Sequence, residues 1–162
     1  MPKWISHFLG LTLILTSPSA WSSIESLEDE IFLLVPTEVR YQDKYYNNEI
    51  MFDGCMMEIK YFAKGKSLSG NRWRRWSYSD YPQNIAKSEL SIDATDDFYG
   101  FMLRIKLAEN SVSMEREREL DDWERKVKRS KYENIKLHFG NDSQAGKLTY
   151  LKMKKLKKAC QK

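Results

Sequence analysis

Residues 142–160, with the sequence DSQAGKLTYLKMKKLKKAC, decide which fold the sequence predicts. Asp142 or Ser143 can cap the first turn of a helix, and no proline interrupts the stretch that follows. Mainly apolar residues recur at steps of three and four residues. They therefore form one stripe, as in a helix that packs one face on a core. The stripe consists of Ala145, Leu148, Thr149, Met153, Leu156 and Cys160. We therefore expect an amphipathic terminal helix whose last stripe position is a cysteine.

The only other cysteine is Cys55, which lies in a segment with the pattern of a strand. Two cysteines in an exported protein are typical of one disulfide bond. The sequence therefore predicts that a bond between Cys55 and Cys160 straps the terminal helix across a sheet. Closing a loop of about 105 residues stabilises a protein by about 4 to 5 kcal/mol in the chain-entropy treatment. Two unpaired thiols are the alternative.

Residues 1–22 have the features of a signal peptide. Lys3 supplies a short positive region, and the apolar run Ile5–Thr16 is too short to span a membrane comfortably. Ala20-Trp21-Ser22 fits a cleavage site, with Ser17-Pro18-Ser19 as the alternative. We therefore expect one domain at residues 23–162 in a periplasmic or secreted protein.

The composition fits one globular domain. Hydrophobic residues make up 41% of the 162 residues and charged residues 31%, which argues against disorder. The net charge is +4, and it becomes +3 (26 minus 23) once Lys3 is removed with the signal peptide. A small positive charge does not imply a nucleic-acid partner, and we expect none.

The dipeptide Asp53-Gly54 is the strongest hairpin signal, because a two-residue type I′ turn favours it. A hairpin folded there pairs Phe52 with Cys55, Ile50 with Met57, Asn48 with Ile59, and Tyr46 with Tyr61. All of these residues except Asn48 are apolar or aromatic, so this face is expected to be core. On the opposite face, Glu49 and Glu58 would lie across from each other.

Alternating apolar residues predict further strands at residues 72–78, 89–93, 99–107 and 135–139. Residues 110–131 are ambiguous, and we expect a strand from Val112 followed by a charged, exposed excursion. Near the start of the domain, a helix from about Ser26 and a strand at 32–35 both fit. The sequence predicts an α+β domain, an antiparallel half-open roll of about six or seven strands closed by a C-terminal helix.

Three features resemble the pleckstrin-homology-like roll. They are the Gly54-Cys55 pair at the opening of a strand, the strand and turn Trp76-Ser77-Tyr78-Ser79-Asp80-Tyr81, and a last strand that leads into a Cys-ended helix. The same order is similar to that of small exported bacterial proteins of unknown function. The resemblance covers most of the domain, and the charged stretch 115–131 departs from it.

Catalytic residue types are scarce. His138 is the one histidine outside the signal peptide, and we expect it on a solvent-facing side of its strand, opposite Leu137 and Phe139. Glu49 and Glu58 could be paired catalytic carboxylates, but an exposed pair is the favoured interpretation. We therefore expect no enzymatic activity.

Metal and cofactor sites are not predicted either. One histidine and two distant cysteines do not give the ligand spacing of a zinc site. The aspartates Asp93, Asp96 and Asp97 could contribute to a calcium site, but a turn between two strands is the favoured interpretation.

The stretch 71–81, NRWRRWSYSDY, has the composition of a contact surface, because Trp, Tyr and Arg dominate binding energy at protein interfaces. The candidate partner-binding residues are Arg72, Trp73, Arg74, Arg75, Trp76, Tyr78 and Tyr81. On a strand these residues divide between two faces, so some of the aromatic rings should be exposed. The alternative is that the arginines stack on core tryptophans at a sheet edge.

We expect an exported, non-catalytic binding protein that blocks a protein partner. Periplasmic immunity proteins and inhibitors of an envelope-targeting toxin, a cell-wall hydrolase or lysozyme are the class it resembles. The alternative is a carrier of a small lipid or glycan, or an envelope-associated module, that uses the open end of the roll. For the lysine-rich face of the terminal helix, exposure to solvent is favoured over contact with a membrane surface.

Overall fold

The computed structural model describes residues 19–66, 70, 72–79, 82–96, 100–107, 112–119 and 125–161. These residues form two α-helices, one short 3-10 helix and ten strands. In chain order they are α1 (Ser19–Leu34), β1 (Glu38–Tyr41), β2 (Lys44–Asp53), β3 (Met56–Lys66), β4 (Arg72–Ser79), β5 (Gln83–Asn84), η1 (Ile85–Lys87), β6 (Glu89–Asp96), β7 (Gly100–Lys106), β8 (Val112–Glu119), β9 (Arg125–Tyr132), β10 (Asn134–Gly140) and α2 (Ser143–Ala159).

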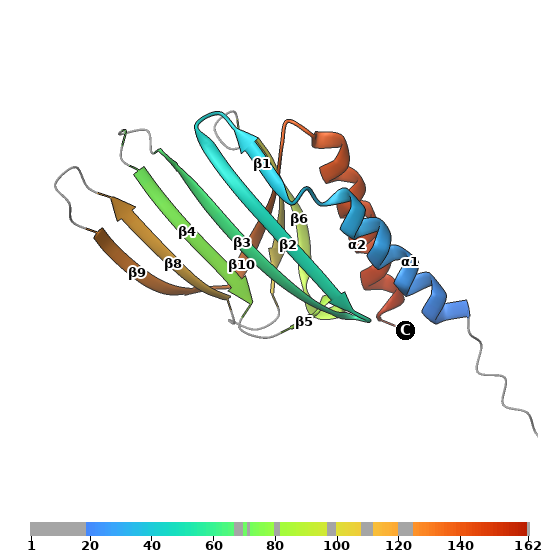
Figure 1. The fold of residues 1–162 in the computed structure, drawn as a ribbon. Coiled ribbons are helices and arrows are strands. Elements are labelled where there is room, and N and C mark those ends of the chain that lie inside the picture. Colours follow the sequence, from blue (N-terminus) through green and yellow to red (C-terminus); the bar gives the residue numbers. More distant parts are fainter. Residues whose placement is uncertain are drawn as a thin grey trace, which may run out of the picture.

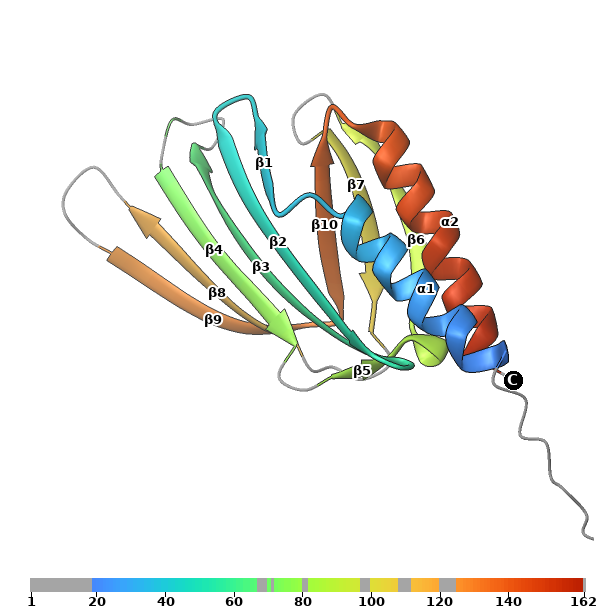
Figure 2. The ribbon, with the colours of Figure 1, turned by 45° about the vertical axis from the view of Figure 1, so that its right-hand side comes forward.

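The strands form two antiparallel sheets. The larger sheet has seven strands, in the order β1-β2-β3-β4-β8-β9 with β5 paired to β3, and the smaller sheet has the order β10-β7-β6. The two helices pack side by side next to the smaller sheet, while β4, β8 and β9 extend away from them (Figures 1 and 2). The expected α+β architecture, an antiparallel sheet with a C-terminal helix, is confirmed. The sequence did not separate the smaller sheet from the larger one.

Helix α1 settles the ambiguity near the start of the domain. Ile24, Leu27 and Ile31 are spaced at three and four residues and pack on the core, with Ile31 fully buried. The helix therefore continues through Phe32 to Leu34, and no strand forms there. Cleavage after residue 22 would fall within α1 and would leave residues 23–34 of it.

Helix α2 forms as its sequence predicts. The side chain of Asp142 caps it by accepting a hydrogen bond from the amide of Ala145 at 2.8 Å. Gly146, Thr149, Met153 and Leu156 are its buried residues. Leu148, which the stripe included, is 39% exposed, so the buried face lies closer to Gly146 than the pattern indicated.

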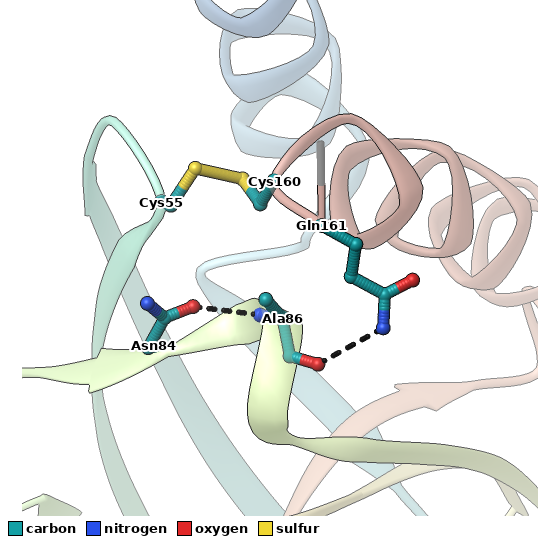
Figure 3. The surroundings of a disulfide bond; sticks show 5 residues. All are labelled: Cys55, Asn84, Ala86, Cys160 and Gln161. Carbon is teal, nitrogen blue, oxygen red and sulfur yellow. Dashed lines mark hydrogen bonds between the residues drawn. A yellow bond between two sulfur atoms is a disulfide. The ribbon is translucent and has the colours of Figure 1, made fainter.

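The disulfide between Cys55 and Cys160 is present, with Cα atoms 5.7 Å apart. Figure 3 shows the bond joining the β2–β3 turn to the end of α2. Beside it, the side-chain amide of Gln161 donates a hydrogen bond to the carbonyl of Ala86 at 3.2 Å. The end of α2 is therefore attached to the hairpin and to η1, as the sequence led us to expect for the hairpin.

The β2–β3 hairpin forms, but its predicted register is wrong by two residues. Asp53 pairs with Met56, so the two-residue turn is Gly54-Cys55, and Ile50 pairs with Ile59. Gly54 has a φ of 59° and is the first central residue, the position at which a type II′ turn requires glycine. A shift of two residues preserves the faces of a strand, and for this reason the predicted inward-facing residues of β2 are correct.

The expectation of a charged excursion after β8 is wrong where the structure describes it. Residues 125–132 form β9, which pairs antiparallel with β8 from Val112–Tyr132 to Glu119–Arg125. β8 in turn pairs with β4. Main-chain hydrogen bonds of a sheet do not depend on which side chains are charged, so a highly charged segment can extend a sheet at its solvent-exposed end.

Candidate functional site

Strand β4 divides the predicted partner-binding residues between the two faces of the larger sheet. Trp73 and Arg75 share the face of Ser77 and Ser79, which are both buried. Arg72, Arg74, Trp76 and Tyr78 lie on the other face, which we call the outer face. The helices and the smaller sheet pack against the inner face in one core cluster, which includes Ile50 and Ile59 of the larger sheet (Figures 1 and 2). Tyr81 lies outside the described residues.

The inner residues of β4 serve the core. Trp73 is 9% exposed and joins a cluster with Val39, Tyr46, Tyr61 and Ala63. The guanidinium of Arg75 lies 5.6 Å from the centre of the Trp73 ring. Stacking of an arginine on a core tryptophan was the alternative to a binding role, and it describes these two residues. Trp73 and Arg75 therefore do not belong to the outer surface.

The outer face carries a continuous series of aromatic rings, which we call the aromatic row and which consists of Tyr45, Phe62 and Trp76. The ring of Tyr45 lies 6.4 Å from that of Phe62, and Phe62 lies 5.3 Å from Trp76, centre to centre. These rings come from β2, β3 and β4 in turn. Tyr78, further along β4, is 46% exposed. Exposure of some aromatic residues of this strand is thus confirmed.

A row of cations borders the aromatic row. The register aligns Arg40 with Tyr45, Tyr45 with Lys64, and Lys64 with Arg74, across four neighbouring strands. The ammonium of Lys64 lies 5.0 Å from the centre of the Tyr45 ring. These residues line a cavity of about 700 Å³ at the end of the sheet where β1 turns into β2. A volume of this size is within the usual range for ligand pockets, about 300 to 1,000 Å³.

Sequence reasoning did not assign four residues of this face to the candidate site, namely Arg40, Tyr45, Phe62 and Lys64. They come from other strands, so no local composition marks them. The signal that identifies them is cross-strand register, because Phe62 pairs with Trp76 and Lys64 with Arg74. The predicted residues Arg72, Arg74, Trp76 and Tyr78 are brought together with them.

The solvent-facing position predicted for His138 is wrong. The residue is 3% exposed, its ring is stacked on Tyr46 at 3.8 Å between centres, and its Nε2 lies 3.0 Å from the hydroxyl of Tyr61. Its backbone amide donates to the side chain of Asn48, which donates back to the His138 carbonyl. β10 thus lies against the inner face of the larger sheet, so both faces of β10 are buried there. This histidine is part of the core.

The carboxylates considered for catalysis are paired with cations. Because of the shifted register, Glu49 lies opposite Lys60, whose ammonium is 3.7 Å from Glu49 and 3.8 Å from Glu58. The two glutamates therefore do not oppose each other, which corrects the predicted like-charge pair. Lys60 offsets the repulsion that the sequence suggested.

Asp93 forms two ion pairs on the smaller sheet. It binds Arg104 at 2.8 Å and Lys136 at 2.9 Å. Burial alone would raise the pKa of Asp93, but hydrogen bonds and charge from Lys136 and Arg104 hold it below its ordinary value. The side chains of Asp96 and Asp97 lie outside the described part of the chain. In the described ranges, no three His, Cys, Asp or Glu residues gather closely enough to hold a metal ion.

None of the described helices is both long enough and apolar enough to cross a membrane. Comparison of the chain with protein-family models, curated proteins and solved structures found no match. The outer face is therefore the feature from which we infer the class of protein.

Proposed function

We propose that this chain is an exported, non-catalytic binding protein that blocks a protein partner with its outer face. The observation that carries the proposal is the aromatic row, which continues into Tyr78, on a sheet surface that the helices leave uncovered. Aromatic residues and arginine are the residues that most often supply binding energy when a partner excludes water from them. Arg74 stands beside this row on the same face of β4.

The disulfide supports the exported part of the proposal. Such bonds persist in oxidising compartments and are rare in the cytosol. The bond also ties the β2–β3 turn to the end of α2, and a constrained surface loses less conformational entropy when it binds. Periplasmic immunity proteins and inhibitors of an envelope-targeting toxin, a cell-wall hydrolase or lysozyme are the proposed class.

The test begins with the purified protein as bait in an envelope extract. Each captured protein is then purified, its dissociation constant is measured by calorimetry, and its hydrolase or toxin activity is assayed with the chain added. The variant Trp76→Ala with Tyr78→Ala should weaken binding at least about tenfold and relieve the block in parallel. Trp73→Ala is unsuitable, because Trp73 is buried and its loss would test folding.

A matched control removes apolar surface elsewhere. Leu33 in α1 is 82% exposed and Leu151 in α2 is 53% exposed, so Leu33→Ala with Leu151→Ala takes away similar area from the helical side. This control should bind within about twofold of the wild type. Unchanged affinity in the Trp76 and Tyr78 variant, or loss in the control alone, would overturn the proposal.

A second candidate function, carriage of a small ligand, is favoured by one observation, the cavity beside the row of cations. Native mass spectrometry of the purified protein tests it, because a carrier retains a small molecule that a steric inhibitor lacks.

A further inference from the structure

The cavity at the end of β1–β4 is strongly cationic. Six lysine and arginine residues and two acidic residues contribute to its lining, so their formal charges sum to +4. The cations are Arg40, Lys44, Lys64, Lys66, Arg72 and Arg74, and the acids are Glu38 and Asp43. In this region, positive charge is concentrated well beyond the small excess of the whole chain.

Two like-charge pairs face each other across β3 and β4. Lys64 lies opposite Arg74, and Lys66 lies opposite Arg72. Like charges directly opposite on a sheet destabilise it, and opposite charges at these positions would have stabilised it instead. Glu117 of β8 is the register partner of Arg74 on its other side, and an anion bound between β3 and β4 would lower the repulsion that remains.

Five exposed cations of the cavity, Lys44 not among them, also differ from others on the surface in their lack of an ion pair within the described residues. Lys60, Lys106 and Lys136 each pair with a carboxylate. Arg40, Lys66, Arg72 and Arg74 make no ion pair within the described ranges, and Lys64 contacts only the Tyr45 ring. These side chains can therefore reorient toward an anion without breaking an ion pair.

One side of the cavity is built from unusual local structure. Lys44 is 3% exposed, although lysine is seldom buried to this extent, and its ammonium lies 3.4 Å from the side-chain oxygen of Gln42. Gln42 has a φ of 51°, a left-handed conformation that favours glycine. Gln42 and Asp43 form the two-residue turn between β1 and β2, and such hairpin turns require a positive φ at the first central residue.

Gly65 makes this arrangement of Lys44 possible. A Cβ atom at Gly65 would lie 2.8 Å from Cγ of Lys44 and 3.1 Å from the Trp73 ring. Glycine therefore leaves the space in which the stem of Lys44 packs between the strands. Several separate local features thus keep a lysine at this position in the wall of the cavity.

We propose that this cavity is a binding site for a ligand that carries two adjacent phosphate groups. A single carboxylate would leave most of the +4 lining charge uncompensated. Two phosphate groups supply several negative charges and many acceptor oxygens, and the planar forks of arginine bind such oxygens in pairs. The same chemistry occurs in a soluble phosphorylated compound and in the headgroup of a phosphorylated lipid. This inference does not rest on the proposed function. Tyr45 and Arg74 lie on the outer face and also line the cavity, but Trp76 and Tyr78, which the partner-binding variant removes, do not line it.

The experiment titrates inorganic pyrophosphate into the purified, oxidised protein by calorimetry, with the thermal midpoint as a second readout. We expect binding with a dissociation constant below about 1 mM, a raised midpoint, and weaker binding as NaCl is raised from about 50 to 500 mM. No heat and no change in midpoint with about 10 mM pyrophosphate would overturn the proposal.

Two charge-matched variants locate the site. Arg40→Gln with Lys66→Gln removes two exposed cations from the cavity, and Lys147→Gln with Lys155→Gln removes two exposed cations from α2. The cavity variant should bind pyrophosphate at least about tenfold more weakly, and the helix variant within about twofold of the wild type. Equal losses in both variants would mean that the anion responds to net charge alone, which would overturn the proposal.

Vesicles distinguish the two sources of phosphate. Phosphatidylcholine vesicles with a bisphosphorylated lipid should bind the wild type and not the cavity variant if the ligand is a lipid. Pyrophosphate binding without vesicle binding assigns the site to a soluble ligand. A third outcome would contradict the assignment: no pyrophosphate binding, together with vesicle binding that the helix variant loses and the cavity variant keeps. That result would place the anion contact on α2. Trp76→Ala with Tyr78→Ala should leave pyrophosphate binding unchanged.

Discussion

The imidazole of His138 lies parallel to the ring of Tyr46, with ring centres 3.8 Å apart and planes inclined by 8°. Tyr61 also stacks against this histidine, at 5.3 Å, and its hydroxyl meets the histidine Nε2. The three side chains join β10 of the smaller sheet to β2 and β3 of the larger one. This contact fixes how the two sheets meet, and with it the position of the outer face relative to the helices.

Replacement of this histidine should therefore weaken the junction of the sheets. His138→Ala removes the ring stacked on Tyr46 and the partner of the Tyr61 hydroxyl, and we expect a loss of about 2 to 4 kcal/mol in the free energy of unfolding. Urea unfolding measures it. Tyr132→Ala, which truncates an aromatic ring that is 43% exposed, should cost less than about 1 kcal/mol. A cost for His138→Ala no larger than that of Tyr132→Ala would show that the stacking contributes little.

The bond between Cys55 and Cys160 should account for a large part of the stability. The two residues are 105 positions apart, and cross-linking a loop of this length is expected to stabilise the fold by about 3 to 5 kcal/mol. Addition of a reductant to the oxidised protein should lower its urea midpoint accordingly. The variant Cys55→Ser with Cys160→Ser should start from that lower midpoint and not respond to the reductant. A midpoint that is the same with and without reductant would contradict the proposed strap.

Gly146 should be essential for the docking of α2. A Cβ atom at this position would overlap the ring of Phe101 in β7 and would lie 3.2 Å from the ring of Phe139 in β10. Gly146→Ala should therefore destabilise the protein by about 1 to 3 kcal/mol, although alanine is the better helix former. Lys147→Ala, at the exposed neighbouring position, should have no such cost. A Gly146→Ala variant as stable as the wild type would mean that α2 can move away from the sheet without loss.

Glu28 should make stability fall as the pH rises. Burial raises the pKa of this carboxyl, and the charges of Glu25, Asp29 and Asp53 raise it further. The folded state thus favours protonated Glu28, and this stabilisation is present below the ordinary carboxyl pKa of about 4 and is lost as the pH rises through the higher folded-state pKa.

Glu28→Gln should therefore raise the thermal midpoint at pH 7 by about 1 to 3 °C and have little effect below about pH 4. Glu25→Gln, one turn earlier in α1, is the matched control and should give a smaller gain, because Glu25 is exposed. An equal gain for Glu28→Gln at both pH values would exclude titration of Glu28 as the cause.

Much of the fold could be predicted from the sequence, because the signals were local. The stripe of α2, the Asp142 cap and the alternation in β7 and β10 each lie within one element. The pairing of the two cysteines followed from their number and from the expected compartment. The hairpin register was missed because Asp53-Gly54 and Gly54-Cys55 are both acceptable two-residue turns, and the chain forms the second.

The rest depended on contacts between distant segments. His138 was placed in solvent because alternation identifies only one buried face, whereas β10 lies between two layers. The charged residues 125–132 form a strand because β8 offers a free edge to pair with. Only the β4 residues of the outer face were predicted as a binding surface, since Tyr45 and Phe62 come to lie beside them through cross-strand register. The cavity could not be predicted, because it combines residues from four strands.

The most direct test of the central claim, that the outer face meets the partner, is hydroxyl-radical footprinting of the protein alone and in its complex. Labelling of Trp76 and Tyr78 should fall in the complex, while labelling of Leu33 and Leu151 on the helical side stays the same. Protection of Leu33 and Leu151 with unchanged Trp76 and Tyr78 would contradict the account and place the partner on the helices.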